Sequence, residues 1–88
     1  LLAFTGLEVC LPPRVPGEKH LKLKLRDSRG RFLDAIGFGL AQRVSEAALH
    51  NLIDIAGFAS ENVWNQTSTL QVEIKDFRSS TTGGGKGR

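Results

Sequence analysis

The strongest constraint on the fold is a strict alternation of leucine with basic residues. The leucines are Leu21, Leu23 and Leu25, and the basic residues around them are His20, Lys22, Lys24 and Arg26. Successive side chains of a β-strand point to opposite faces. The segment therefore predicts a strand with one apolar face, turned toward a core, and one positively charged face at the surface.

A turn and a second strand follow directly. Asp27-Ser28-Arg29-Gly30 has turn chemistry, because Asp and Ser side chains bond to nearby backbone and Gly accepts a positive φ. The run from Arg31 to Gly39 predicts a partner strand, so the whole segment is a β-hairpin. Residues 19–31 of it contain one acidic residue, Asp27, and the basic residues Lys19, Lys22, Lys24, Arg26, Arg29 and Arg31. Such a local positive field favours a polyanion, and the alternative is a solvated basic face.

The rest of the chain predicts three more strands and one short helix. Residues 1–11 are rich in large apolar residues and predict a strand with Gly6 at a bend or bulge. The proline-rich residues 11–17 must leave the sheet, since proline removes a ladder donor. The later segments are a helix at 40–49, a strand at 52–60, a loop at 61–69 and a strand at 70–77.

This order of elements is that of an OB-fold, an all-β Greek-key barrel of five strands with a helix between strands three and four. An SH3-like barrel is the main alternative, but it does not usually place a helix at that connection. We predict an OB-fold domain over residues 1–78 and a flexible Ser/Thr/Gly-rich tail at 79–88. The usual OB ligand surface comprises strands two and three and the loops after strands one and four.

Composition removes several other classes of function. Cys10 is the single cysteine, so there is no disulfide framework, and a reducing, cytoplasmic location is expected. His20 and His50 lie far apart, and the carboxylates form no cluster of the kind that a two-metal nuclease needs. No apolar run reaches the ~20 residues of a membrane span. Since no initiator Met or signal peptide precedes Leu1, we expect a piece of a longer protein.

The candidate site residues are the basic residues of the hairpin and one aromatic residue. Lys22, Lys24 and Arg26 are expected to face phosphates, and Lys19, Arg29 and Arg31 to extend the track. Trp64 lies in the loop after strand four, where it either stacks a base or covers the open end of the barrel. Phe38 is expected in the core, and Phe58 on the exposed side of its strand. No catalytic residue and no metal ligand is predicted.

Four segments then resemble the OB domain of RecJ-type single-strand-specific DNA exonucleases. They occur in the family's order and cover most of residues 1–78: Lys19–Asp27, Leu33–Gly39, Asn62–Asn65 and Leu70–Arg78. The family often has Gly after Trp-Asn, where this chain has Gln66.

The resemblance implies a non-catalytic module attached to a metal-dependent DHH-type nuclease core, which digests a single strand from its 5′ end. The implied partners are single-stranded DNA and the catalytic domains of the same parent chain. Mg²⁺ or Mn²⁺ is expected in that core, and no cofactor in this segment. The alternative is a docking module that packs against the core and has little affinity for nucleic acid.

Overall fold

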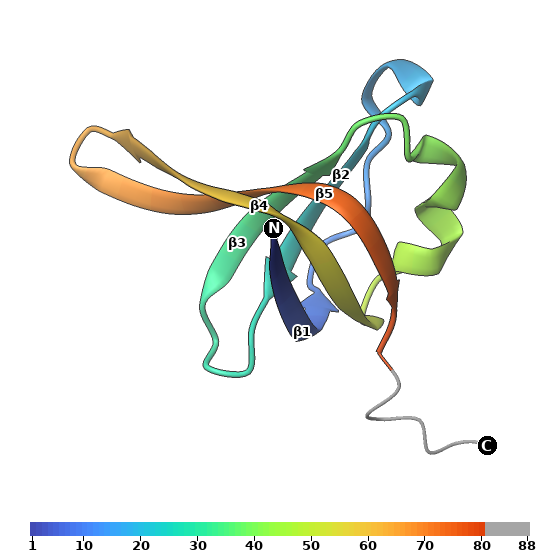
Figure 1. The fold of residues 1–88 in the computed structure, drawn as a ribbon, viewed down its shortest axis with the longest axis horizontal. Helices are drawn as coiled ribbons and strands as arrows, with labels where there is room; N and C mark the ends of the chain where they lie inside the picture. Colours follow the sequence, from blue (N-terminus) through green and yellow to red (C-terminus); the bar gives the residue numbers. More distant parts are fainter. Residues whose placement is uncertain (81–88) are drawn as a thin grey trace.

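Five strands form a closed barrel in the order β1-β2-β3-β5-β4. The computed structural model describes residues 1–80, apart from the side chains of Asn62 and Trp64. The elements, drawn in Figure 1, are β1 (Leu2–Val9), η1 (Pro16–Glu18), β2 (Leu21–Arg26), β3 (Phe32–Gly37), η2 (Ala41–Ala47), β4 (Leu52–Trp64) and β5 (Thr67–Ser79). The predicted OB-fold is confirmed. The predicted tail falls, for residues 81–88, outside the described residues.

The apolar face of β2 lies in the barrel core, as the alternation predicts. Leu21, Leu23 and Leu25 are at most 4% exposed, whereas Lys22 and Arg26 on the other face are exposed. Apart from Gly37 and Gly57, the buried residues among those described are all hydrophobic: Leu7, Val9, Leu21, Leu23, Leu25, Leu33, Ala35, Ala47, Ile53, Ile55, Val72, Ile74 and Phe77. Every polar side chain on β2 is thus left on the outside of the barrel.

The β2–β3 hairpin has the predicted turn. One carboxylate oxygen of Asp27 accepts hydrogen bonds from the backbone N–H groups of Arg29 and Arg31, both at 2.9 Å. Gly30 has φ +81°, a conformation that residues with a Cβ rarely adopt. The register that follows places Arg26 opposite Phe32 and Leu21 opposite Gly37.

The barrel closes through two further pairings. β1 runs antiparallel to both β2 and β4, and its register shifts between Phe4 and Leu7, around the predicted bulge at Gly6. Gly6 has φ +65°, and its N–H donates to Asp54 at 3.0 Å. β3 and β5 pair in parallel, centred on Ala35 and Val72. The sheet therefore closes on itself, and within the barrel each strand pairs with a neighbour on both sides.

The predicted loop at 61–69 is wrong, because β4 and β5 continue through it as a hairpin. The last pair is Trp64 with Thr67, and the two-residue turn uses Asn65 (φ +50°) and Gln66 (φ +64°). Two positive φ values suit the twist of a hairpin. We call residues 60–71 the β4–β5 arm; Figure 1 shows it projecting beyond the barrel. The sequence suggested a loop because an arm outside the core needs no alternating apolar residues.

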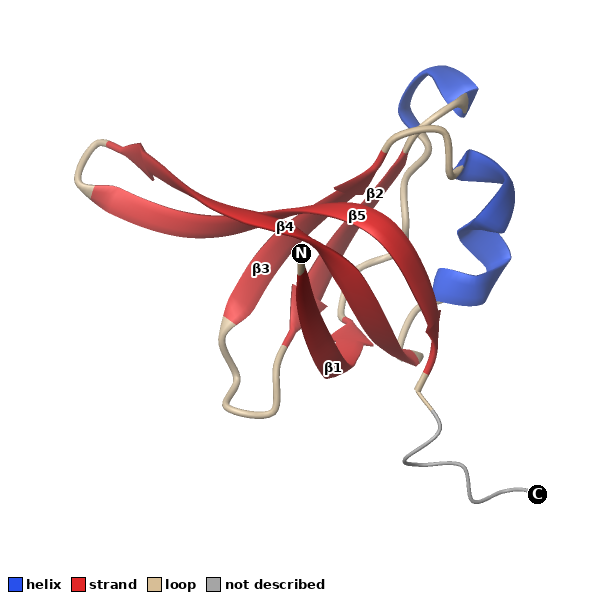
Figure 2. Ribbon diagram, in the orientation of Figure 1, coloured by secondary structure: helices blue, strands red, loops and turns tan. Residues whose placement is uncertain are grey.

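The segment predicted as a helix at 40–49 forms the shorter 3-10 helix η2, which packs against β2 and β5 (Figure 2). Backbone angles at Arg43 (φ −96°, ψ 16°) depart from helical values. Its guanidinium donates to Glu46 and Asp76 at 2.8 Å and to the Phe77 carbonyl at 2.6 Å. The hydrogen bonds from Arg43 lower the pKa of the Glu46 and Asp76 carboxyl groups. Arg43 thereby ties η2 to the end of β5.

Candidate nucleic-acid interface

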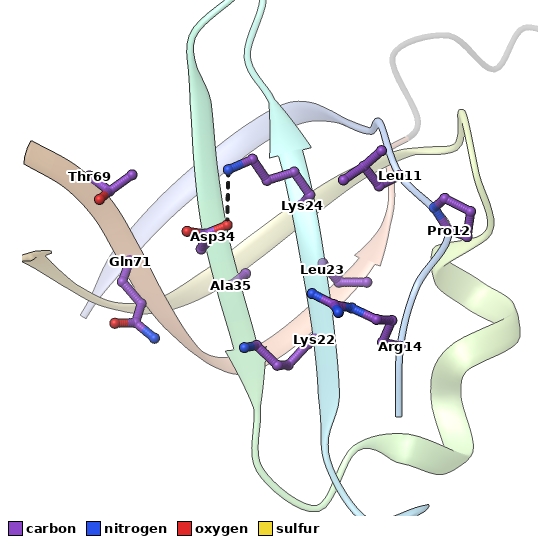
Figure 3. A pocket seen from close by; sticks show the side chains of 10 residues that line it. All are labelled: Leu11, Pro12, Arg14, Lys22, Leu23, Lys24, Asp34, Ala35, Thr69 and Gln71. Carbon is purple, nitrogen blue, oxygen red and sulfur yellow. Dashed lines mark hydrogen bonds and ion pairs between the residues drawn. The ribbon is translucent and has the colours of Figure 1, made fainter. Parts of the chain in front are cut away.

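A surface groove of about 660 Å³ lies along the basic face of β2. Its walls come from the loop after β1, from β2 and β3, and from the part of β5 that enters the β4–β5 arm. Figure 3 shows its lining residues, which are Leu11, Pro12, Arg14, Lys22, Leu23, Lys24, Asp34, Ala35, Thr69 and Gln71. We call it the basic groove. It occupies the surface where an OB barrel usually binds its ligand.

Arg14 and Lys22 are brought together by the backbone. The Arg14 N–H donates to the Lys22 carbonyl at 3.0 Å, and the Lys22 N–H donates to the Arg14 carbonyl at 2.8 Å. The prediction that residues 11–17 stay away from the sheet is therefore wrong at Arg14. This isolated bridge sets two cationic side chains next to each other (Figure 3). Neither forms an ion pair or a side-chain hydrogen bond with any residue that the structure describes.

Sequence reasoning did not include Arg14 among the site residues. The available signal was its position, since Arg14 is the one charged residue of the segment 11–17. That segment had already been assigned to the OB ligand surface. The backbone pairing with β2, which aligns Arg14 with Lys22, has no local sequence signature.

Lys24 also lines the basic groove, but its charge is partly neutralised. Its Nζ lies 3.2 Å from Oδ1 of Asp34, which sits directly opposite on β3. Figure 3 shows this pair bridging β2 and β3. Both side chains keep substantial exposure, so the ion pair is accessible to water and to a competing anion.

Arg26 forms an ion pair outside the basic groove. Its guanidinium lies 2.8 Å from Oε1 of Glu8, the residue opposite it on β1, and Nδ1 of His50 lies 3.0 Å from Oε2 of Glu8. Hydrogen bonds from His50 and then from Arg26 lower the pKa of Glu8. Within residues 19–31 Asp27 is the one acidic residue, but in the fold the carboxylates of Glu8 and Asp34 on neighbouring strands also face the basic cluster.

The other predicted residues do not line the basic groove. Arg31 Nε lies 3.1 Å from Oδ2 of Asp27, and Arg29 is exposed in the turn. Lys19 is exposed beside η1. Backbone hydrogen bonds from Arg31 are the largest cause of a lowered pKa at Asp27. The predicted stacking residue Trp64 ends β4, and its side chain lies outside the described residues.

The predicted exposure is confirmed for Phe58 and is wrong for Phe38. Phe58 is 50% exposed, as expected from its side of β4. Phe38 was expected in the core but is 56% exposed, because it follows Asp34 and Ile36 on the outer side of β3, opposite the buried Leu33 and Ala35. Its ring contacts His20 edge to face, with 5.2 Å between the ring centroids.

The described residues contain no group of three His, Cys, Asp or Glu side chains placed to hold a metal ion. Among the helices of residues 1–80, none has the length and apolar character needed to span a membrane.

Comparison with known proteins supports the fold seen here. The family described as the RecJ OB domain matches residues 1–76. Among solved structures, the SSB domain of a protein from Synechococcus sp. is similar with a TM-score of 0.63 and 11% sequence identity. The similarity covers 88% of this chain and 91% of that chain. A search of curated proteins found no match.

Proposed function

The chain belongs to the RecJ OB domain family, and from this premise we propose that it is a non-catalytic module that binds single-stranded DNA. In this proposal the basic groove holds phosphates without reading base identity. The module serves a larger 5′–3′ exonuclease specific for single strands, which acts in the cytoplasm. The catalytic domains of that parent chain are its second partner, and Mg²⁺ or Mn²⁺ belongs to those domains.

The observation that carries the proposal is the pair of cations formed by Arg14 and Lys22 on the ligand surface of the barrel. Both are exposed and have no carboxylate partner among the described residues. Lys24 adds a third cation, against the single carboxylate of Asp34. Cations in a groove attract a phosphate backbone and release its condensed counterions, which gives affinity independent of sequence.

A salt titration tests the proposal. The anisotropy of a dye-labelled oligo(dT) is measured with the chain at several salt concentrations. Each phosphate contact to a single strand adds about 0.7 to the slope of log affinity against log salt. We expect a slope of about −1.4 or steeper from Arg14 and Lys22. The double variant Arg14→Gln/Lys22→Gln should lose most of the binding without a lower melting temperature, because both side chains are exposed.

Two results would contradict the proposal. A flat salt response, or no binding at low salt, would favour the docking module that packs on the catalytic core. Degradation of labelled single-stranded DNA by the isolated chain with Mn²⁺ would contradict its non-catalytic role.

A further inference from the structure

A second groove adjoins the basic groove on the outer face of the sheet. It has a volume of about 280 Å³, and its lining includes Ile36, Phe38, Phe58 and Gln71. Gln71 lines both grooves, so the two share a wall. We call this second groove the aromatic groove.

The strand register places the two grooves along one line. Lys22 lies opposite Ile36, Ile36 opposite Glu73, and Glu73 opposite Phe58. Neighbouring strands lie ~4.8 Å apart, so Lys22 and Phe58 are separated by about 14 Å across the sheet. A ligand that lies across the strands therefore reaches the cations at one end and the aromatic rings at the other.

Charge divides this line into two chemically different halves. Arg14 and Lys22 offer cations that no described carboxylate pairs with, whereas Glu73 puts a carboxylate in the wall of the aromatic groove. Nζ of Lys75 lies 3.0 Å from Oε2 of Glu73, so this pair has no net charge to attract a phosphate, and the apolar rings form no hydrogen bond with one. The same Nζ is 5.9 Å from the Phe58 ring centroid. The aromatic groove thus suits a neutral, flat group better than an anion.

We propose that Phe38 and Phe58 bind an unpaired nucleobase of the strand whose phosphates lie over Arg14 and Lys22. This inference rests on the proposed function and adds to it a contact with an unpaired base, which is the feature that distinguishes a single strand from a duplex. Bases stack on exposed aromatic rings whatever their identity, because every base has a π-face. The Gln71 amide, which has no side-chain hydrogen bond to a described residue, lies between the two grooves and can bond a base edge.

The proposal also explains how the groove rejects a duplex. In double-stranded DNA the bases are stacked on one another, so none is available to Phe38 or Phe58. A duplex can still attract Arg14 and Lys22 through its phosphates. The aromatic groove therefore adds selectivity where the basic groove adds only affinity for a polyanion.

The experiment compares an oligo(dT) with an abasic oligonucleotide that has the same sugar–phosphate backbone. Stacking on an aromatic side chain is worth about 1–3 kcal/mol per base, so the parent chain should bind oligo(dT) roughly five- to a hundredfold more tightly. Phe58→Leu keeps an apolar side chain but removes the ring. It should lower the affinity for oligo(dT) several-fold and leave the affinity for the abasic strand unchanged.

Phe32→Leu is the matched control. Phe32 is 55% exposed, close to the 50% of Phe58, and lies on β3 outside both grooves. Nζ of Lys24 lies 5.7 Å from the Phe32 ring centroid, so any effect of Phe32→Leu through Lys24 should be the same for oligo(dT) and the abasic strand. The ratio of the two affinities should therefore stay that of the parent chain in Phe32→Leu and fall in Phe58→Leu. An equal fall of this ratio in both variants would overturn the proposal, because the stacking would not be localised to the aromatic groove.

The outcomes separate the two proposals. If neither oligonucleotide binds, the proposed function fails. If both bind equally and Phe58→Leu has no effect, the function stands and this inference fails. The rings would then face a protein surface such as the catalytic domains.

Discussion

The two ends of β2 present the same kind of residue in different surroundings. Lys22 and Arg26 lie on the same face of one strand, and both are exposed. Lys22 lies opposite Arg14, another cation, whereas Arg26 lies 2.8 Å from the carboxylate of Glu8. One end of the strand therefore keeps its positive charge available and the other end is neutralised. The neighbouring strands, not the number of lysines and arginines in the segment, decide which charges can meet a phosphate.

The largest expected effect is the loss of DNA binding in Lys22→Gln, compared with Arg26→Gln at the other end of β2. Lys22→Gln should weaken oligo(dT) binding by about tenfold, since a hydrogen bond to a charged group contributes about 1.5 kcal/mol or more. Its salt slope should fall by about 0.7. Arg26→Gln should change neither quantity appreciably, because Arg26 is outside the basic groove. Fluorescence anisotropy at several salt concentrations measures both.

Equal losses in Lys22→Gln and Arg26→Gln would remove the distinction between the two ends. Binding would then depend on the total charge of the hairpin. Thermal melting of both variants by circular dichroism checks that each remains folded.

A smaller effect of the opposite sign is expected from Asp34→Asn. The substitution keeps the shape of the side chain but releases Lys24, whose Nζ is 3.2 Å from Asp34. A surface ion pair is worth about 0.2–1 kcal/mol, so affinity for oligo(dT) should rise by up to about fivefold. The rise should be smaller in a Lys24→Gln background. A loss of affinity would show that Asp34 orients Lys24 toward the phosphate and does not compete with it.

The smallest effect concerns the neutralised end and depends on pH. The pKa of Glu8 is lowered below its ordinary 4.5 by the hydrogen bonds from His50 and Arg26. A lowered carboxyl pKa stabilises the fold above pH 4.5, and that contribution is lost as the pH falls through the lowered value. Melting of the parent chain and of Glu8→Gln should therefore differ most near neutral pH and converge in acid.

Glu8→Gln also provides a control on function. It removes the partner of Arg26 but touches nothing in the basic groove. At neutral pH its affinity for oligo(dT) should equal that of the parent chain. A marked gain would mean that Arg26, once released, reaches the DNA.

Much of the fold follows from local patterns in the sequence. The alternation of Leu21, Leu23 and Leu25 identifies the strand and its buried face, and Asp27 with Gly30 identifies the turn. These features are encoded by residues close to one another, because side-chain period and turn conformation are local properties.

The β4–β5 arm and Phe38 escaped prediction for a related reason. The arm projects from the barrel, so its strands have no apolar face to reveal them; the signal that remained was Asn65, which tolerates positive φ. Phe38 shares the outer side of β3 with Asp34 and Ile36, opposite the buried Leu33 and Ala35. Apolar residues occur on both sides of that strand, so the apolar pattern did not show which side faces the core.

The candidate site is only partly encoded in this local way. Lys22 and Lys24 were identified on the correct face, but their partners lie on other elements: Arg14 on the loop after β1 and Asp34 on β3. The hairpin register could have placed Asp34 opposite Lys24, since the turn fixes the pairing. The return of Arg14 to β2 required the three-dimensional structure.

The backbone bridge between Arg14 and Lys22 has a consequence for the unbound domain. Two like charges facing each other across a bridge repel, and their backbone hydrogen bonds hold them there. Removing either charge relieves this repulsion, so Arg14→Gln and Lys22→Gln should melt no lower than the parent chain even though they weaken the binding of DNA. The free domain thus contains a small electrostatic repulsion between two side chains, which the negative charge of a bound phosphate would offset.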